Sequence, residues 1–177
     1  WNGCSHSCFA DTDPCSSLLI VSEQGIGDVI QFFRFTLDLQ RQHPSMSITV
    51  LVNQNLKSLF QPTQNIHVID KTQLPNISCH FKIALMSLPH RLRLTVITPP
   101  SDSYIRTSPS KIKYWKQQLN VLQKFKIGLT WHGAKNYQYL HTKYIPLTLF
   151  KNIANLPIDL ISLQKHDGVE ELDSIDF

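Results

Sequence analysis

The stretch from Leu18 to Phe33 constrains the fold of this chain more than any other. It opens with four apolar residues between polar neighbours, a pattern that predicts a buried strand. A turn with two glycines follows, and apolar residues then recur without a helix breaker to about Gln42. That length and apolarity predict a helix covered on much of its surface. Strand, Gly-x-Gly turn and helix together predict the first unit of a Rossmann-like α/β layer.

The glycine turn is where we expect chemistry. Gly25 and Gly27 would let the backbone adopt positive φ and let a ligand approach closely. The free N–H groups at the start of the following helix would favour an anion. The turn is not a dinucleotide fingerprint, because the third glycine of Gly-x-Gly-x-x-Gly would fall at Ile30.

Asp28 has two competing interpretations. It sits where the helix should begin, so its carboxylate could cap the first turn by accepting amide hydrogen bonds. Alternatively, it could be a general base that takes a proton from a hydroxyl brought to the turn. The residues alone favour the cap, because Asp is a preferred capping residue.

The residues Glu23-Gln-Gly-Ile-Gly-Asp-Val-Ile-Gln-Phe32 resemble the motif that opens the glycosyltransferase domain of bacterial tetratricopeptide-repeat glycosyltransferases. These are relatives of the ADP-heptose:lipopolysaccharide heptosyltransferases. Further matches follow in order at Trp1-Asn-Gly3, Leu85-Met-Ser-Leu-Pro89, Tyr104, Trp115, Leu119, Lys126-Ile-Gly-Leu-Thr-Trp-His-Gly133, Ile145-Pro-Leu147 and Ser162-Leu-Gln-Lys165. The resemblance implies that Asp28 is the catalytic base and that Glu23, Gln24, Gly25 and Gly27 form a turn on the acceptor side.

The middle of the chain alternates strand and helix patterns. Strands are predicted at 47–52, 66–69 and 81–86, and a short helix between the first two at 54–60. This alternation predicts a parallel sheet. A further helix at 111–123 carries Trp115, Leu119 and Leu122 at helical spacing, which predicts a buried face with Trp115 as a packing anchor.

A second strand-to-glycine turn begins at Lys126 and reaches Gly133. Two such turns predict two Rossmann-like halves, a complete one at 1–124 and the beginning of another at 125–177. The resemblance implies the GT-B architecture, in which the acceptor lies against the first half and the donor nucleotide against the second. On that basis the donor-binding residues would be Trp131, Gly133, Lys143, Gln164 and Lys165. Lys143 would meet the donor phosphates, and its alternative is an exposed lysine before a helix.

Composition excludes several classes of protein. The chain has 177 residues, is 42% hydrophobic and 17% charged, and can bury a core. Its formal net charge of +4 is mild. The basic segment around Lys111 to Lys126 could form a phosphate-binding face, but it is more typical of a solvated helix face. The chain lacks the aromatic and basic interleaving of a nucleic-acid module, so we expect no nucleic-acid partner. No apolar run is long enough for a membrane helix. The chain starts at Trp1 without a secretory leader, so we expect a piece of a longer, cytoplasmic protein.

Three of the four cysteines, Cys4, Cys8 and Cys15, fall in the polar leader, and Cys79 lies apart from them. Their spacings match no standard zinc pattern, so we expect no metal site. A disulfide is possible, but no secretion signal supports it.

We therefore expect a fragment of an inverting, metal-independent glycosyltransferase. It would move a sugar from a nucleoside-diphosphate donor, as co-substrate rather than cofactor, to a hydroxyl of a glycan, lipid or protein. One alternative is a non-catalytic, truncated transferase half that serves as a binding or assembly module. A second is a Rossmann-type nucleotide binder such as an oxidoreductase, which the missing third glycine disfavours.

Overall fold

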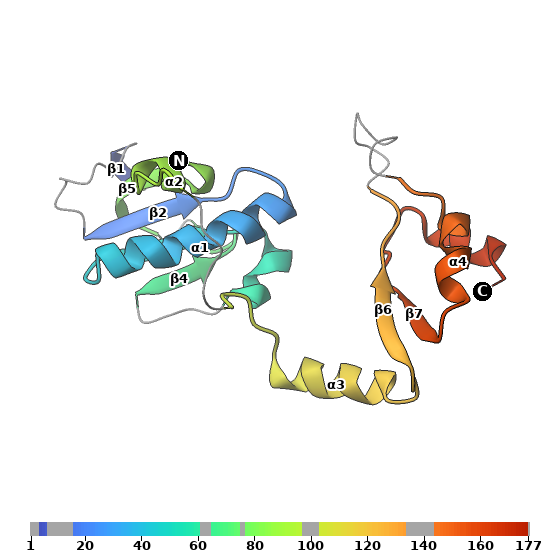
Figure 1. Cartoon of the computed structure of the whole chain (residues 1–177). Helices are drawn as coiled ribbons and strands as arrows, with labels where there is room; N and C mark the ends of the chain where they lie inside the picture. Colours follow the sequence, from blue (N-terminus) through green and yellow to red (C-terminus); the bar gives the residue numbers. More distant parts are fainter. Residues whose placement is uncertain are drawn as a thin grey trace. The chain divides into compact units, whose positions relative to one another are not determined.

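The computed structural model describes residues 4–6, 16–60, 65–74, 77–96, 103–133 and 144–176, with the backbone alone for 4–6. The chain forms two compact units, Trp1–Ser108 and Pro109–Phe177 (Figure 1). The division falls before the helix at Pro109–Leu119 rather than after it. Each unit is described separately below.

The first unit is built on a five-stranded sheet in which every pair of neighbours is parallel. The strand order is β1-β5-β2-β3-β4. The strands are β1 (Cys4–His6), β2 (Ser17–Val21), β3 (Ser47–Leu51), β4 (Ile66–Ile69) and β5 (Cys79–Ala84). The predicted α/β class and parallel sheet are confirmed. The chain moves from β2 to β3 and β4 on one side, and returns to β5 on the other, so the order reverses beside β2.

The predicted buried strand is β2, and it lies at the centre of the unit. Leu18, Leu19 and Ile20 have no exposed surface, because β3 and β5 flank the strand and side chains cover both faces. Leu18 and Ile20 join the larger core with α1, and Leu19 joins a smaller cluster on the other face. Cys79 belongs to that smaller cluster and is disulfide-bonded.

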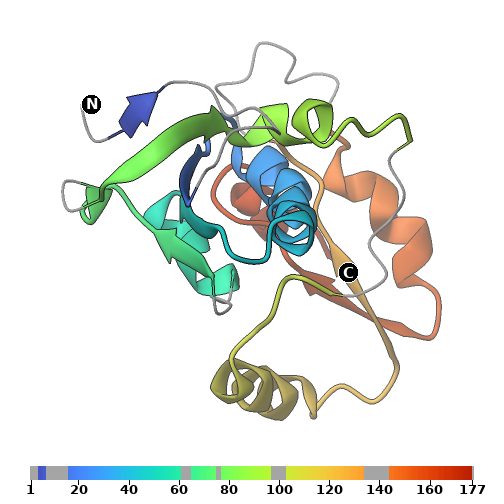
Figure 2. The same cartoon turned by 90° about the vertical axis from the view of Figure 1, so that its left-hand side faces the viewer.

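The helix α1 (Ile26–Gln42) covers one face of this sheet (Figures 1 and 2). Its buried positions, including Val29, Phe33 and Leu39, recur at helical spacing and face the strands. Phe33 stacks on Phe60 with ring centroids 3.9 Å apart, which joins α1 to the end of the 3₁₀ helix η1 (Gln54–Leu59). The segments η3 (Leu85–Ser87) and α2 (Leu88–Arg91) follow β5 and contribute Leu85 and Leu88 to the same core.

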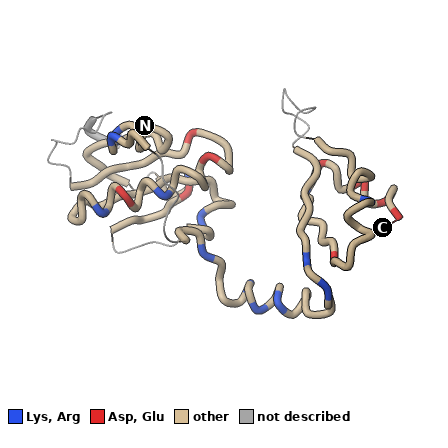
Figure 3. The backbone as a smooth tube through the Cα atoms, in the orientation of Figure 1, with Lys and Arg blue, Asp and Glu red and all other residues tan. Residues whose placement is uncertain are grey.

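The second unit begins with α3 (Pro109–Leu119) and contains a two-stranded parallel sheet of β6 (Phe125–Leu129) and β7 (Ile158–Ser162). It also contains η5 (Leu147–Phe150), α4 (Lys151–Ala154) and η6 (Val169–Ser174). Basic positions follow α3 and the start of β6 (Figure 3). The predicted buried face of this helix is wrong, because α3 has no buried residue and Trp115 is 57% exposed.

None of the helices in the described part of the chain combines the length and apolarity needed to cross a bilayer.

Candidate functional site

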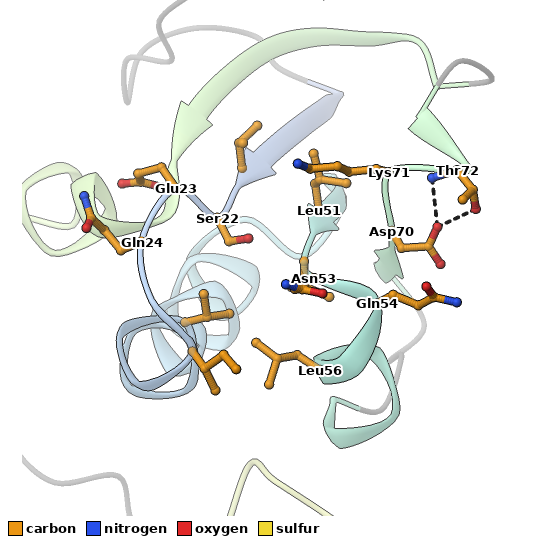
Figure 4. A pocket seen from close by; sticks show the side chains of 14 residues that line it. Ser22, Glu23, Gln24, Leu51, Asn53, Gln54, Leu56, Asp70, Lys71 and Thr72 are labelled. Atoms are coloured by element: carbon orange, nitrogen blue, oxygen red, sulfur yellow. Dashed lines mark hydrogen bonds between the residues drawn. The ribbon is translucent and has the colours of Figure 1, made fainter. Parts of the chain in front are cut away.

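A pocket of about 570 Å³ opens at the carboxyl ends of β2, β3 and β4 (Figure 4). This edge of a parallel α/β sheet is where such folds bind ligands. Its apolar wall comes from the strand ends, α1 and η1, and consists of Val21, Ile26, Val29, Leu51, Val52 and Leu56. Its polar wall consists of Ser22, Gln24, Asn53, Gln54, Lys71 and Thr72, together with the carboxylates of Glu23 and Asp70. An apolar wall with a few convergent polar groups is typical of a small-molecule site.

The glycine turn differs from its prediction in backbone geometry. Gly25 has φ −63° and ψ 167°, and Gly27 lies inside the first turn of α1, so neither adopts positive φ. The glycines matter instead for the space they leave. A Cβ on Gly27 would meet nothing within 4 Å, so the first turn of α1 is open to an approaching group.

Asp28 is the third residue of α1, because the helix begins at Ile26 and its N-cap is Gly25. The prediction that Asp28 caps the helix is therefore wrong. Its carboxylate lies close to Gly25, where a Cβ would come within 3.4 Å of Oδ2. Asp28 is half-buried and does not line the pocket itself, although Ile26 and Val29 on either side do. A proton acceptor thus stands in the helix turn beside the pocket.

Glu23 joins the turn to the neighbouring strand. Its carboxylate accepts hydrogen bonds from the backbone N–H groups of Leu85, at 3.2 Å, and Met86, at 3.4 Å. These bonds cross the sheet between β2 and β5, where the strand order reverses. Glu23 therefore fixes the turn against the end of β5, and both Glu23 and Gln24 belong to the pocket lining (Figure 4).

Asp70, at the end of β4, was not predicted from the sequence. It is only 8% exposed, and its Oδ1 accepts hydrogen bonds from the Thr72 N–H, at 2.9 Å, and from the Thr72 hydroxyl. Its Oδ2 lies 3.2 Å from Lys57 Nζ. The Thr72 hydrogen bonds, helped by Lys57, hold the pKa of Asp70 below its usual value against the opposing effect of burial. The strand-Asp-x-Thr pattern is the signal that could have indicated this turn.

Three of the predicted donor-binding residues, Gln164, Trp131 and Gly133, make contacts within the second unit. The Gln164 side chain accepts the N–H groups of Trp131 and His132, at 3.0 and 3.1 Å, and donates to the His132 carbonyl at 3.0 Å. Trp131 is buried and its indole donates to the Gly168 carbonyl at 3.1 Å. The Gly133 carbonyl contacts His132 Nδ1.

The other two predicted donor-binding residues are Lys165 and Lys143. Lys165 is exposed, so its side chain is available to a ligand. Lys143 lies outside the described residues. An Asp-x-Asp sequence, Asp11-Thr-Asp13, also lies outside them. Within the described ranges, no group of three or more His, Cys, Asp or Glu residues is placed to hold a metal ion.

Comparison with known proteins gives one distant similarity. The chain is 23% identical over 176 residues to the protein FlbA of Caulobacter vibrioides. The match takes in 88% of this chain but 29% of FlbA, so the chain spans less than a third of that relative's length. No family model and no solved structure matches the chain.

Proposed function

We propose that this protein is a sugar transferase of the GT-B type that moves a sugar from a nucleoside-diphosphate donor to an acceptor hydroxyl. The observation that carries the proposal is the pocket at the carboxyl ends of β2, β3 and β4, with the Asp28 carboxylate in the adjoining first turn of α1. The resemblance of the turn and of the later motifs to tetratricopeptide-repeat glycosyltransferases selects this reaction among those that a carboxylate beside a pocket can serve.

In this reaction Asp28 acts as the general base. The acceptor hydroxyl lies over the open first turn at Gly27, and its proton passes to the Asp28 carboxylate as its oxygen attacks the anomeric carbon of the donor. The new bond forms on the face opposite the bond to the diphosphate, which breaks with its electron pair, so the anomeric configuration inverts. Lys143 and Lys165 are the cations that we expect to balance the charge of the leaving diphosphate.

Donor turnover tests the reaction class. The purified protein is incubated with a panel of nucleotide sugars, with and without a chelator, and release of the nucleoside diphosphate is measured. We expect slow release from one donor, with water or an added alcohol as acceptor, no loss of rate with the chelator, and an inverted product by NMR. A retained configuration or a rate abolished by the chelator would contradict the mechanism.

The same experiment separates the transferase from the non-catalytic module. A module that only binds or assembles would hold a nucleotide sugar or an acceptor without releasing nucleoside diphosphate. No release from any donor in the panel, together with measurable donor binding, would favour the module.

A further inference from the structure

The charged groups of the pocket are unequally engaged. Glu23 accepts hydrogen bonds from two backbone N–H groups of η3, and Asp70 is held by Thr72 and Lys57. Lys71 is the cation of the lining, and it is exposed. No hydrogen bond or ion pair joins Lys71 to another residue in the described ranges. The pocket therefore presents one positive charge without a counter-ion.

The turn that carries Lys71 is rigidly placed. Asp70 and Thr72, on either side of it, are tied to each other through the Asp70 carboxylate, and the Gln73 N–H donates to the Asp70 carbonyl at 3.1 Å. In Figure 4 the Lys71 side chain runs away from the Asp70 carboxylate and toward Leu51 at the end of β3. The negative charge of Asp70 is thus already compensated by Thr72 and Lys57, and the ammonium group of Lys71 is directed across the strand ends.

A second donor faces the same space. The Asn53 side chain accepts the Asn55 N–H through Oδ1, at 3.4 Å, as the cap of η1. With its oxygen used in this way, the Asn53 amide has its NH₂ group left to donate into the pocket that it lines. An ammonium and an amide NH₂ at one pocket form a site for an anionic oxygen group.

We propose that this pocket binds an acceptor that carries a carboxylate or phosphate, and that Lys71 pairs with that group while Asn53 donates to it. The uncharged hydroxyls of such a molecule would meet the amide and hydroxyl side chains of Gln24, Gln54 and Ser22. The name acceptor rests on the transferase function proposed above, but recognition of the acid does not.

The test measures binding of three small probes that share a sugar ring: glucuronic acid, glucose 6-phosphate and glucose. Each is titrated into the ¹⁵N-labelled protein at low ionic strength, and the dissociation constant and the shifted amides are recorded. We expect at least one acid to bind about fivefold more tightly than glucose, since an exposed ion pair contributes an effect of this size. The shifts should fall at residues 22–24, 51–54 and 70–72, and the preference should weaken as salt is added.

Variants assign the effect to Lys71. Lys71→Gln should remove the preference for the acid, and Lys71→Glu should reverse it, whereas Lys113→Gln on α3 should leave it unchanged. Preference for glucuronic acid alone would identify a carboxylate site, and preference for glucose 6-phosphate alone a phosphate site. The proposal is overturned if neither acid binds, if both bind no better than glucose, or if Lys71→Gln keeps the preference.

The outcome is independent of turnover. If no donor is turned over but the preference for acids is intact, the pocket remains a binding site for acids. Donor turnover without any acid preference would leave the transferase and remove the role of Lys71.

Discussion

The two units start from the same pattern, an apolar strand that leads into a glycine-containing turn, and they bury it very differently. In the first unit the three central residues of β2 are fully buried. In the second, Phe125 at the start of β6 is 74% exposed, and no residue of the strand is buried. In the first unit β2 pairs on both edges and packs under α1, whereas β6 pairs with β7 alone among the described strands.

The comparison shows that an apolar strand is buried only where other elements cover its faces, because even the edge strand β4 of the first unit buries Ile66 and Ile69. Leu163, just beyond β7, is 62% exposed, and Val121, before β6, is 78% exposed. The second unit buries the side chains of Trp131 and Leu147, and hydrogen bonds around Gln164 and Trp131 join its segments. The first unit is therefore stabilised mainly by apolar packing, and the second relies more on a few polar contacts.

The largest predicted difference between the units comes from removing a phenylalanine in each. Phe33→Ala takes away a fully packed ring that stacks on Phe60, and it should cost about 3–5 kcal/mol of stability in the first unit. Phe125→Ala should change stability by no more than about 0.5 kcal/mol, because its ring is largely in solvent. Denaturant unfolding of both variants measures this. Equal losses would mean that β6 is covered as well as β2.

An intermediate effect is expected at a pair of glycines. Gly168 has φ 85°, and a Cβ there would lie 2.5 Å from His132 Cβ, so Gly168→Ala should cost about 1–3 kcal/mol in the second unit. Gly27 lies in a helical turn with open space around it, so Gly27→Ala should gain about 0.5–1 kcal/mol in the first. Hydrogen exchange of amides in each unit reports the two effects separately. A tolerated Gly168→Ala would show that the left-handed turn before η6 is not required.

The smallest expected effects concern the loss of folding stability at acid pH. The pKa of Asp70 is lowered in the fold, so its contribution to stability is complete above the usual pKa of 3.8 and is lost as pH falls through the lower folded value. Asp70→Asn should remove this part of the acid dependence. Asp176 also has a lowered pKa, through Lys151, but that pair is exposed, and added salt should abolish its effect while that of Asp70 persists. Unfolding curves at low and high salt between about pH 2 and 5 compare the two carboxylates.

Much of the first unit could be predicted from the sequence because its strands carry the signal themselves. Leu18 to Ile20, and Ile48 and Val50 in the alternating run, are buried as their patterns indicate, and Val21 is half-buried. The helix at α3 could not be predicted in the same way. Periodicity shows that Trp115 and Leu119 share a face, but it does not show that another element covers that face.

One part of the candidate site could likewise be predicted from the sequence, and another part could not. The position of Asp28 beside a ligand pocket follows from the strand-turn-helix order, which places the turn at the carboxyl edge of the sheet. Its exact place in the helix, third rather than capping, depends on where the backbone enters α1. Asp70 and Lys71 could not be connected with the turn from the sequence alone, because β4 is brought to it only by the pairing of β3 with both β2 and β4.

The most direct test of the account is the rate of donor turnover in Asp28→Asn compared with Asp38→Asn. Both substitutions remove a carboxylate from α1, but Asp38 lies far along the helix, where it pairs with Arg41 in solvent. With donor binding and thermal stability measured in the same preparations, we predict a loss of about 10²–10⁴-fold in Asp28→Asn alone. An unchanged rate in Asp28→Asn, with folding and donor binding intact, would contradict the role of Asp28 as the base.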